Sequence, residues 1–349
     1  MLKFSWGKYM SLQEKLLKLN ALKKLQNKTI LVSGATGLIG KALVRELLNL
    51  NKSANLNLKL ILVVRDYSKL DFYLNQYMDE GTIKVIIQDI VNPFTQEQLE
   101  IDYIIHTASI TSSKLMVETP VEVITTSIIG TLNLLHIALK SHIKSMVYLS
   151  SMEIYGFTKN EVLLSEKDIQ YLNPLEIRSC YPESKRMCEN LCVAYASEYG
   201  VPIKIARLAQ TFGKGVEKQD SRVFAYFGRK VLNNEDIVLM TDGQSKRMYV
   251  DIEDAVSAIL IVLLKGDSGE AYNIANKETY CSIVEMANLV AHELTHDKIQ
   301  VKFENDESSS KQFSPPHRLM LNTEKIESLG WRAENGLLDM YKKMLEGWI

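Results

Sequence analysis

The sequence predicts an α/β protein with a doubly wound parallel sheet and a smaller C-terminal α/β lobe. Three observations carry this prediction. Short apolar runs alternate with helical patterns up to residue 208, a glycine-rich turn joins the first run to the first long helical pattern, and shorter elements follow. Because each helix between two strands must pack against the sheet, this alternation produces a parallel sheet with helices on both faces.

Six apolar runs of strand length are the expected strands of the large sheet, at residues 29–33, 59–64, 83–88, 102–107, 144–150 and 202–207. Apolar residues recur at helical spacing after residue 37 and over about residues 121–140 and 182–199. We therefore expect one large domain over residues 28–208, preceded by a short segment at residues 1–27.

After residue 208 the expected elements become shorter. Helices are expected near residues 222–233, 251–264, 282–296 and 335–347, and strands near 237–240, 271–275 and 299–303. The polar stretch 304–317 is a loop by composition. Residues 209–349 are therefore predicted to form the smaller, substrate-binding lobe, and crossings of the chain between the two parts are left open.

The composition, with 46% hydrophobic and 24% charged residues, is that of an ordinary globular protein. A net charge of -1 offers no overall field for nucleic acid, and no apolar run approaches the ~18 residues of a membrane span. The four cysteines show no CxxC spacing, and Cys188 and Cys192 lie one helical turn apart. This pattern predicts packed free thiols in a reducing compartment, which we take to be the cytoplasm.

The first 28 residues carry seven lysines against one acid, Glu14. Leu12, Leu16, Leu19 and Leu22 recur at helical spacing, which predicts a basic amphipathic helix. The segment lacks the apolar core of a secretory signal. We expect this helix to pack against the domain that follows, and a membrane-surface or targeting role is the alternative.

The stretch SGATGLIG lies directly between the first strand and the first long helix. In a dinucleotide-binding turn, the first glycine permits the bend, the second lets the backbone approach a pyrophosphate, and the third lets helix and strand pack closely. The free N–H groups at the helix start then face the phosphates. The expected cofactor-binding residues of this turn are Gly34, Thr36, Gly37, Leu38, Ile39 and Gly40. A glycine turn with only a structural role is the alternative.

The ends of the next strands complete the expected cofactor site. Arg65 and Asp66 follow the second strand, with Lys69 nearby. An acid here favours the ribose hydroxyls of NAD, and an arginine favours the extra phosphate of NADP, so both cofactors stay open. Further cofactor contacts are expected at the ends of the third and fourth strands, from Asp89, Ile90, Ala108 and Ser109.

Ser151 ends the fifth strand, and Tyr181 and Lys185 lie four residues apart in the helical pattern that follows. This spacing places both side chains on one helical face. A tyrosine ordinarily keeps its proton up to pH ~10, but a neighbouring ammonium and an oxidised nicotinamide ring favour the phenolate. Tyr181 is therefore expected to act as a base beside the cofactor, with Ser151 steering a substrate hydroxyl.

With these motifs the chain resembles the extended short-chain dehydrogenases/reductases, within the nucleotide-sugar epimerase/dehydratase family. The resemblance runs from about residue 28 to the C-terminus, through GATGLIG, HTAS, IIGTLNLL, LSSMEIYG, YPESK and SKRMYVDIEDAV. The stretches IRSCYPESKRMCE and HTASITSS look closest to the UDP-glucuronate decarboxylase branch. The resemblance implies a Rossmann domain, catalytic roles for Ser151, Tyr181 and Lys185, and a substrate contact by Arg247. It also implies a homodimer held by a four-helix bundle of residues 121–140 and 182–199.

Glu153 stands where the epimerases of this family usually have a small or hydroxylated residue, and in this respect the chain is similar to the decarboxylases and 4,6-dehydratases. Once a ketone forms at carbon 4 of the sugar, loss of CO₂ or of water becomes feasible, and a carboxylate can move the proton. Glu153 is therefore expected to be catalytic. The alternative is that Glu153 points to solvent beside the sheet edge.

Three positions depart from the family pattern. Met152 replaces the aspartate of the glucose-type dehydratases, Gln210 replaces an asparagine after the sixth strand, and Ser127 replaces one before GTLN. Because these positions lie near the substrate in the family, its identity stays open. The residues expected to bind substrate are Ser112, Arg178, Gln210, Arg222 and Arg247, and the three arginines are candidates to bind a sugar carboxylate.

The stretch HELTH at residues 292–296 matches the zinc-protease pattern. Ile283, Met286 and Val290 lie on another face of the same helix, so His292 and His296 are expected to meet solvent. We treat the match as accidental and expect no metal.

The leading hypothesis is a cytoplasmic NAD(P)-dependent enzyme that decarboxylates or dehydrates a nucleotide-activated sugar through a transient 4-keto intermediate. A reductase or dehydrogenase of a nucleotide-linked keto-sugar or polyol is the second hypothesis, which Arg65, Lys69 and the altered loop at Gln210 would suit. A 4-epimerase is a further alternative. A non-catalytic dinucleotide sensor is the alternative from another class, and the intact set of Ser151, Tyr181 and Lys185 argues against it.

Overall fold

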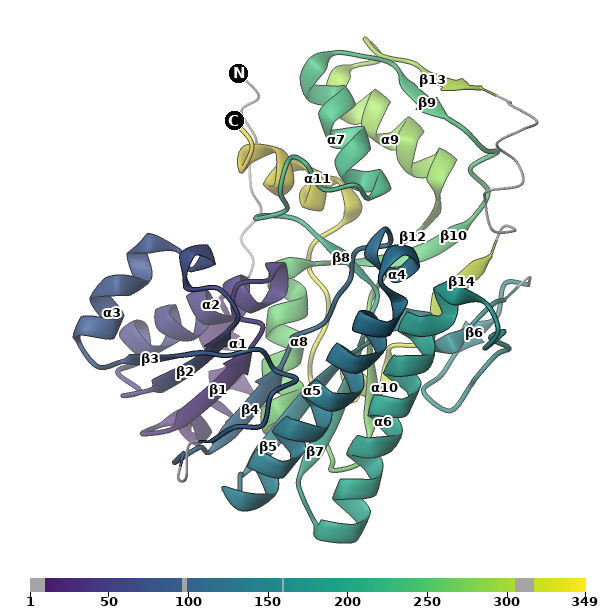
Figure 1. Cartoon of the computed structure of the whole chain (residues 1–349). Coiled ribbons are helices and arrows are strands. Elements are labelled where there is room, and N and C mark those ends of the chain that lie inside the picture. Colours follow the sequence, from purple (N-terminus) through teal and green to yellow (C-terminus); the bar gives the residue numbers. More distant parts are fainter. Residues whose placement is uncertain (1–9, 96–98, 159, 305–316) are drawn as a thin grey trace.

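The computed structural model describes residues 10–95, 99–158, 160–304 and 317–349, and a seven-stranded parallel sheet forms its centre (Figure 1). The strand order is β11-β7-β5-β4-β1-β2-β3. The strands are β1 (Thr29–Ser33), β2 (Lys59–Val64), β3 (Ile83–Ile87), β4 (Tyr103–His106), β5 (Ser145–Ser151), β7 (Ile203–Leu208) and β11 (Ala271–Ile274). The order reverses between β1 and β4, as in a doubly wound sheet, so the predicted fold class is confirmed.

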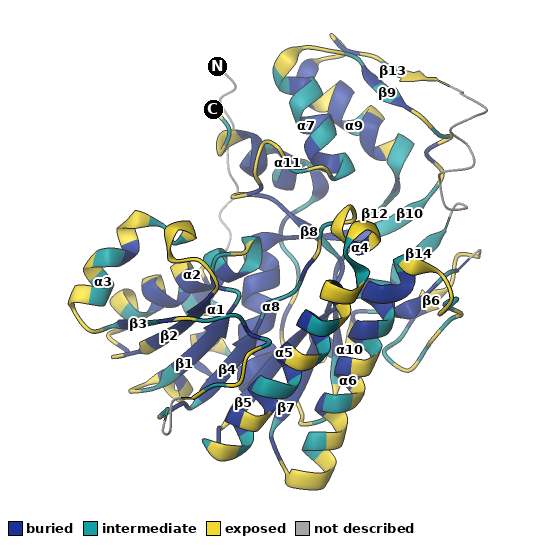
Figure 2. Ribbon diagram, in the orientation of Figure 1, coloured by how far each residue is buried: buried dark blue, intermediate teal, exposed yellow. Residues whose placement is uncertain are grey.

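Helices cover both faces of this sheet. Helices α5 (Pro120–Lys140) and α6 (Cys180–Tyr199) lie along one face, and α2 (Leu38–Ala54) and α8 (Ile252–Lys265) lie along the other (Figure 1). Successive side chains of β1 alternate between the two layers. Ile30 and Val32 belong to the core under α2 and α8, and Leu31 belongs to the core under α5 and α6. Figure 2 shows the central strands as the buried interior between these layers.

The strand expected at residues 271–275 is β11, which pairs with β7 and completes the central sheet. The chain therefore crosses back from the smaller lobe to the large sheet, as the sequence analysis left open. Helix α8 makes the same crossing, and 12 of its 14 residues are buried. It is apolar on all sides because it packs against β5, β7, α2 and β10 (Lys246–Asp251).

The smaller lobe is built around a mixed sheet in the order β12-β10-β14-β6, with β8 also paired to β10. These strands are β6 (Leu163–Leu164), β8 (Gln210–Phe212), β12 (Asn276–Ser282) and β14 (Arg318–Leu321). A separate pair joins β9 (Ile237–Leu239) to β13 (Val301–Phe303). Helices α7 (Val223–Asn233), α9 (Ile283–Thr295) and α11 (Leu337–Glu346) pack together beside them (Figure 1).

The remaining elements are short. They are α1 (Leu12–Lys18), α3 (Asn75–Asp79), α4 (Leu115–Glu118), α10 (Glu324–Ser328) and the 3₁₀ turns η1 (Leu22–Leu25), η2 (Tyr67–Lys69), η3 (Phe72–Leu74), η4 (Met152–Tyr155) and η5 (Ile177–Ser179). Residues 1–9 of the expected basic segment and most of the expected polar loop, 305–316, lie outside the described residues.

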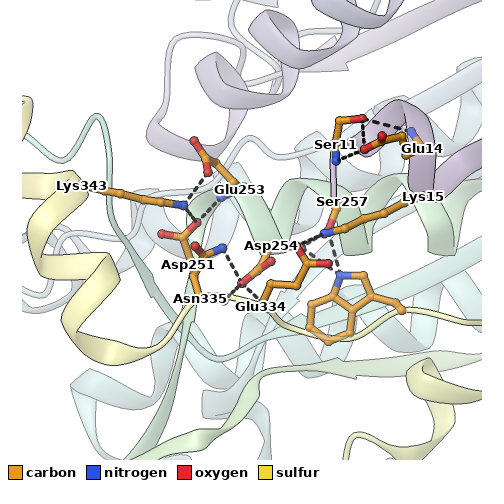
Figure 3. Close-up of polar contacts among 11 residues, drawn as sticks. Ser11, Glu14, Lys15, Asp251, Glu253, Asp254, Ser257, Glu334, Asn335 and Lys343 are labelled. Atoms are coloured by element: carbon orange, nitrogen blue, oxygen red, sulfur yellow. Dashed lines mark hydrogen bonds and ion pairs between the residues drawn. The ribbon is translucent and has the colours of Figure 1, made fainter. Parts of the chain in front are cut away.

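Helix α1 packs against the large domain, as expected. Ser11 and Glu14 cap its start reciprocally, and Leu12 and Leu16 are buried. Lys15 pairs with Glu334 at 3.1 Å, at the segment that precedes α11 (Figure 3).

The start of α8 binds the same segment (Figure 3). The carboxylate of Asp254 accepts hydrogen bonds from the backbone N–H groups of Glu334 and Asn335, at 3.0 and 2.9 Å, and from the side chain of Asn335. The indole of Trp331 donates to the hydroxyl of Ser257 at 2.9 Å. These contacts join the segment before α11 to α8, and Lys15 joins α1 to the same segment.

Among the described helices, α5 has the length and composition of a membrane-crossing helix, but only by those two criteria. Half of its most apolar window is buried in the fold, where it packs against α6 and β4. Such burial is ordinary for a core helix of an α/β sheet.

The two histidines of the HELTH stretch are exposed, as expected. His292 lies 2.9 Å from Asp297, and His296 takes the left-handed conformation that ends α9. Within the described ranges no group of three or more His, Cys, Asp or Glu residues is placed to hold a metal. All four cysteines are free thiols, and Cys188 and Cys192 are buried, as expected.

Candidate active site

A pocket of about 310 Å³ opens at the carboxyl ends of β4, β5 and β7, beside the start of α2. In a doubly wound sheet the loops at this edge, near the point where the strand order reverses, form the binding crevice. Among the described residues that line it, four are cations (Arg178, Lys185, Arg222 and Arg247) and one, Glu153, is an acid. The pocket therefore favours an anionic ligand.

The glycine turn forms one wall of this pocket. Gly34 has a φ of +70°, and a Cβ there would lie 2.7 Å from the backbone of Ala108. A Cβ on Gly40 would lie 2.1 Å from the carbonyl oxygen of Gly34. Gly37 is the N-cap of α2 and has no side chain to cap the helix. The first N–H groups of the helix, which have no partner inside it, therefore remain for a ligand.

Ser151, Tyr181 and Lys185 lie together in the pocket. Tyr181 and Lys185 occupy one face of α6, and the nearby hydroxyl of Ser151 acts to lower the pKa of Tyr181. The Nζ atom of Lys185 donates to the carbonyl oxygen of Leu149 at 2.7 Å. The same atom lies 5.8 Å from the centre of the Tyr181 ring and 4.8 Å from that of Tyr148.

Burial dominates the acidity of this group. Burial, followed by the charge of Glu153, raises the pKa of Tyr181, although Ser151, Arg178 and Arg222 act in the opposite direction. Burial also lowers the pKa of Lys185 to about 8. The protein alone therefore makes Tyr181 less acidic, because a buried phenolate beside a carboxylate is costly. The expected phenolate depends on the positive charge of an oxidised nicotinamide ring as well as on Lys185.

Glu153 lines the pocket and does not lie at an open sheet edge. Its backbone N–H donates to the hydroxyl of Ser151 at 3.2 Å, which starts the turn η4 directly after β5. Its carboxylate oxygens accept hydrogen bonds from Nη2 of Arg178 at 2.9 and 3.2 Å. The turn therefore holds the acid, and its arginine partner, at the mouth of the site.

A buried ion pair holds the last residue of η4 in place. Arg207 of β7 binds Glu189 of α6 at 2.7 Å and donates to the hydroxyl of Tyr155 at 3.0 Å. Tyr155 ends η4 and donates in turn to Asn273 at 2.5 Å. Removing one partner of such a buried pair costs roughly 3–5 kcal/mol, so this network fixes the position of the turn that carries Glu153.

Two of the three candidate arginines are paired with carboxylates. Arg178 binds Glu153, and Arg222 binds Asp220 at 2.6 Å, with a second nitrogen 3.0 Å from the other carboxylate oxygen. The charge of each guanidinium is therefore largely offset inside the protein.

Arg247 has neutral neighbours instead. It donates to the side-chain oxygen of Gln210 at 3.1 Å, and its other terminal nitrogen lies 3.3 Å from a ring nitrogen of His317. Burial and Arg247 itself lower the pKa of His317 to about 4, so this ring is uncharged at neutral pH. The Nε atom of Arg247 is buried and has no hydrogen-bond partner among the described residues. Among the described residues no carboxylate pairs with Arg247, whose side chain lines the pocket.

The residues expected near the cofactor's ribose lie beyond this pocket, at the ends of β2 and β3. Asp66 accepts a hydrogen bond from the backbone of Ser68 at 2.9 Å and starts η2. Arg65 lies 4.0 Å from Asp89 and 3.8 Å from Glu122. The charge of Arg65 is therefore shared between two carboxylates.

The structure brings most of the expected site residues to one pocket. Those that line it are Gly37, Leu38, Ile39, Gly40, Ser109, Ser151, Glu153, Arg178, Tyr181, Lys185, Gln210, Arg222 and Arg247. Those that do not line it are Gly34, Thr36, Arg65, Asp66, Asp89, Ile90, Ala108 and Ser112. Ser112 instead accepts the backbone N–H of Leu115 at 3.4 Å, near the start of α4.

Several lining residues were not predicted from the sequence. They are Thr107, Thr111, Ser113, Met116, Leu149, Ser150, Leu208, Ala209 and Thr211, whereas Met152, which was expected near the substrate, also lines the pocket. Most of them directly follow or end β4, β5 and β7, so the rule that ligands bind at the carboxyl ends of parallel strands would have found them. The hydroxyls of Ser109 and Ser150 are buried and lack hydrogen-bond partners in the part of the chain that the structure describes.

Comparison with known sequences adds independent information. The model of the NAD dependent epimerase/dehydratase family matches residues 30–275. UDP-glucuronic acid decarboxylase 5 of Arabidopsis thaliana is 30% identical over 312 residues, which cover 88% of this chain and 85% of the plant protein. UDP-glucuronic acid decarboxylase 1 of Xenopus tropicalis is 26% identical over 329 residues, which cover 93% and 75% of the two chains.

Solved structures share the fold. A UDP-glucose 4-epimerase from Thermotoga maritima, solved with UDP-glucose, superposes with a TM-score of 0.75 at 24% identity, covering 92% of this chain and 98% of its own. A dTDP-glucose 4,6-dehydratase from Streptomyces venezuelae, solved with NAD, gives a TM-score of 0.75 at 21% identity, with 92% and 96% covered. At these identities the likeness establishes the fold and leaves the reaction to the site.

Proposed function

Because the chain belongs to the NAD dependent epimerase/dehydratase family, we propose that it uses NAD to decarboxylate a nucleotide-linked uronic acid through a ketone at carbon 4. One observation carries this proposal: the ion pair of Glu153 and Arg178, 2.9 Å apart, shares a pocket with Tyr181. A 4-epimerase needs only the tyrosine and a ketone, whereas decarboxylation also needs a cation for the carboxylate and a group that moves a proton. The curated relatives are named UDP-glucuronic acid decarboxylases, which makes UDP-glucuronic acid the first substrate to test.

The turn between β1 and α2 fits a dinucleotide. Side chains on Gly34 and Gly40 would collide with backbone atoms, so the turn keeps the close packing that a pyrophosphate site requires. The unpartnered hydroxyls of Ser109 and Ser150 offer hydrogen bonds to a bound molecule. The residues that would hold NAD here are Gly37, Leu38, Ile39, Gly40, Ser109, Tyr181 and Lys185, with Asp66 at the ribose. When bound, NAD⁺ supplies a hydride acceptor and a positive charge.

We favour NAD over NADP because of Arg65. An arginine that accommodates a 2′-phosphate needs charge to spare, and Asp89 and Glu122 offset the charge of Arg65. Asp66 remains at the position where an acid binds the ribose hydroxyls of NAD.

Tyr181 is the proposed base that takes the proton from the sugar hydroxyl at carbon 4. Its pKa is raised by burial, so it depends on positive charge nearby to give up its own proton. Lys185 provides such a charge from within α6, and the bond to Leu149 keeps its ammonium in place. Ser151, which shares the pocket with Tyr181, orients the hydroxyl of the substrate.

A ketone at carbon 4 turns the sugar carboxylate at carbon 5 into a β-keto acid, which loses CO₂ readily because the ketone takes up the electron pair. We assign Arg178 to the substrate carboxylate, since it already binds a carboxylate in this pocket. Glu153, released from that pair, takes up a proton from water and delivers it to carbon 5 in place of the lost CO₂. Arg247, which pairs with no acid in the part of the chain that the structure describes, suits the diphosphate.

We further propose a cytoplasmic homodimer. Helices α5 and α6, which lie side by side, expose a set of apolar side chains: Val121, Ile124, Ile129, Met187, Val193 and Tyr199. Exposed apolar side chains on two adjacent helices are typical of an interface. The four free thiols fit a reducing compartment.

The test is incubation of the purified protein and NAD⁺ with UDP-glucuronic acid, analysed by mass spectrometry. We expect a UDP-linked pentose, lighter than the substrate by CO₂, with no net formation of NADH. UDP-, dTDP-, CDP- and GDP-linked neutral sugars serve as the comparison panel. Loss of water from a neutral sugar would identify a dehydratase instead. Stoichiometric consumption of NADPH, in a parallel incubation that contains it, would identify a reductase. Cofactor binding without any turnover of the panel would mean that the protein is a sensor.

A further inference from the structure

A second hollow lies at the opposite edge of the central sheet. It has a volume of about 530 Å³ and is bounded by the amino-terminal ends of β4, β5 and β7, by η1 and by the last turn of α8. Because the strands are parallel, this edge lies a full strand length from the candidate active site, roughly 20 Å along a strand like β5. The two hollows are therefore separate.

Lysines dominate this second hollow. Among the described residues that line it, six are lysines and none is acidic: Lys23, Lys24, Lys28, Lys144, Lys204 and Lys265. We call these six residues the lysine pocket. They come from η1, the start of three strands and the end of α8, so only the folded chain brings them together.

Few negative groups offset these charges. Asp102 pairs with Lys28 at 3.2 Å and with Lys144 at 3.0 Å. Lys24 donates to the carbonyl oxygen of Leu264 at 2.6 Å, at the end of α8. A helix C-terminus carries only about half a negative charge. Most of the positive charge of the pocket therefore remains.

Lys204 is the most informative member. It lies within β7, a strand in which every residue is buried, and it is 6% exposed. Its ammonium donates to the hydroxyl of Ser145 at 2.7 Å, and the described residues offer it no other hydrogen-bond partner. Burial and the charge of Lys24 lower its pKa to about 8, although the charge of Asp267 acts in the opposite direction. An ammonium can donate three hydrogen bonds, and a buried charge with one neutral partner is costly.

We propose that the lysine pocket binds an anion that carries two or more phosphate groups. Several ammonium groups around one hollow match the distributed charge and the many acceptor oxygens of such a ligand. Capping of α8 explains Lys24 and Ser145, whose hydroxyl donates to the carbonyl of Leu263. Capping does not explain Lys23, Lys144 and Lys204, which donate no hydrogen bond to that helix among the residues described.

The phosphate groups can come from a free oligophosphate or from lipid headgroups at a membrane surface, and the test separates these sources. Inorganic pyrophosphate is titrated calorimetrically into the full-length protein, with NAD⁺ and UDP present in excess to fill the candidate active site. Vesicles of phosphatidylglycerol, with phosphatidylcholine vesicles as reference, are examined by co-sedimentation. Neither readout depends on turnover, so the result is independent of the proposed function.

The pocket variant is Lys23→Gln with Lys144→Gln, and its control is Lys52→Gln with Lys84→Gln, which removes the same charge from exposed sites elsewhere. We expect saturable binding of pyrophosphate, weakened roughly tenfold or more in the pocket variant and unchanged in the control. Binding of the anionic vesicles alone, with the same dependence on the variants, would assign the phosphates to lipid headgroups.

Lys204→Met is the second variant and tests the buried ammonium directly. We expect it to weaken binding of the same probe. If Lys204→Met fails to fold, as judged by circular dichroism, the pocket variant still tests the proposal, because Lys23 and Lys144 are exposed. Absence of binding by both probes, or equal weakening in the pocket and control variants, would overturn the proposal.

Discussion

One guanidinium nitrogen of Arg178 lies 2.9 Å from one carboxylate oxygen of Glu153 and 3.2 Å from the other. Arg178 comes from η5, directly before α6, and Glu153 comes from η4, directly after β5. The pair therefore joins the segment that leads to Tyr181 to the segment that follows Ser151. Their side chains are 38% and 36% exposed, and an ion pair so accessible adds at most about 1 kcal/mol to stability. The ion pair therefore matters for the chemistry of the pocket and not for the stability of the fold.

Glu153→Gln tests the proposed proton transfer. Glutamine keeps the shape and an oxygen for Arg178 but cannot move a proton. We expect NAD affinity and the fold to be unchanged, while formation of the UDP-linked pentose slows by roughly a hundredfold or more. The measurement is single-turnover kinetics by mass spectrometry, together with calorimetric titration of NAD⁺. Full activity of this variant would remove the role assigned to Glu153.

Arg178→Ala tests recognition of the substrate carboxylate. Loss of one charge-assisted contact should weaken binding of UDP-glucuronic acid roughly tenfold or more. Binding of UDP-glucose, which has no carboxylate, should change little and serves as the internal control. Both affinities can be measured by calorimetry on the protein loaded with NAD⁺. If the affinities for both ligands fell equally, Arg178 would stabilise the site without binding the substrate carboxylate.

Much of the fold could be predicted because local patterns decide it. The apolar runs of β1, β2, β4, β5 and β7 are buried on both faces of the sheet, so they are apolar almost throughout and visible in the sequence. The turn from Gly34 to Gly40 was equally readable, since only glycine fits two of its positions. Tyr181 and Lys185 were recognised because their spacing places them on one helical face.

What could not be predicted depends on contacts distant in sequence. β11 looks like any short strand, and only its pairing with β7 places it in the large sheet. Nothing local indicates that His317 lies beside Arg247, 70 residues away. The raised pKa of Tyr181 depends on burial and on Glu153, neither of which the spacing of Tyr181 and Lys185 contains.

Gly40→Ala tests the close packing of the cofactor turn. The added Cβ would lie 2.1 Å from the carbonyl oxygen of Gly34 and 2.9 Å from the Cα atom of Ala35, and both are backbone atoms that have to shift. We expect a loss of about 1–3 kcal/mol in unfolding free energy and clearly weaker NAD binding. Gly336→Ala is the matched control, because its Cβ would meet only Asp339 at 3.6 Å. An undisturbed NAD affinity in Gly40→Ala would contradict the packing argument.

Asp251→Asn tests a buried acid at the start of α8. Asp251 is fully buried, and burial raises its pKa from 3.8 to about 6, although Lys343 lies 3.3 Å away. Because the folded state holds this proton more tightly than the unfolded chain, the contribution of Asp251 to stability is full below pH ~4 and is lost as the pH rises to about 6. This pKa shift corresponds to a change of order 3 kcal/mol in the free energy of unfolding.

The measurement is the difference in unfolding free energy between the wild type and Asp251→Asn, from urea titrations between pH 4 and 8. Taking the difference cancels the contributions of groups that titrate in both proteins. Two such groups are His106 and His317, because burial lowers the pKa of His106 to about 3 and that of His317 to about 4. Their effect on stability with pH is opposite to that of Asp251. We expect the wild type to lose stability relative to the variant up to pH ~6, and the difference to be constant above pH ~7. A difference independent of pH would refute this.

Val121→Glu combined with Ile124→Glu tests the proposed dimer. Both side chains lie on α5 and are 70% and 38% exposed in one protomer, so the substitutions should leave the fold of that protomer nearly unchanged. Within an interface, however, each would bury an unpaired carboxylate, which is strongly unfavourable. We expect light scattering coupled to size exclusion to show a dimer for the wild type and a monomer for the double variant. Ile87→Glu, on the exposed end of β3, is the matched control, because Ile87 is 62% exposed and lies away from α5 and α6. A monomeric wild type, or a double variant that remains dimeric, would place the interface elsewhere or remove it.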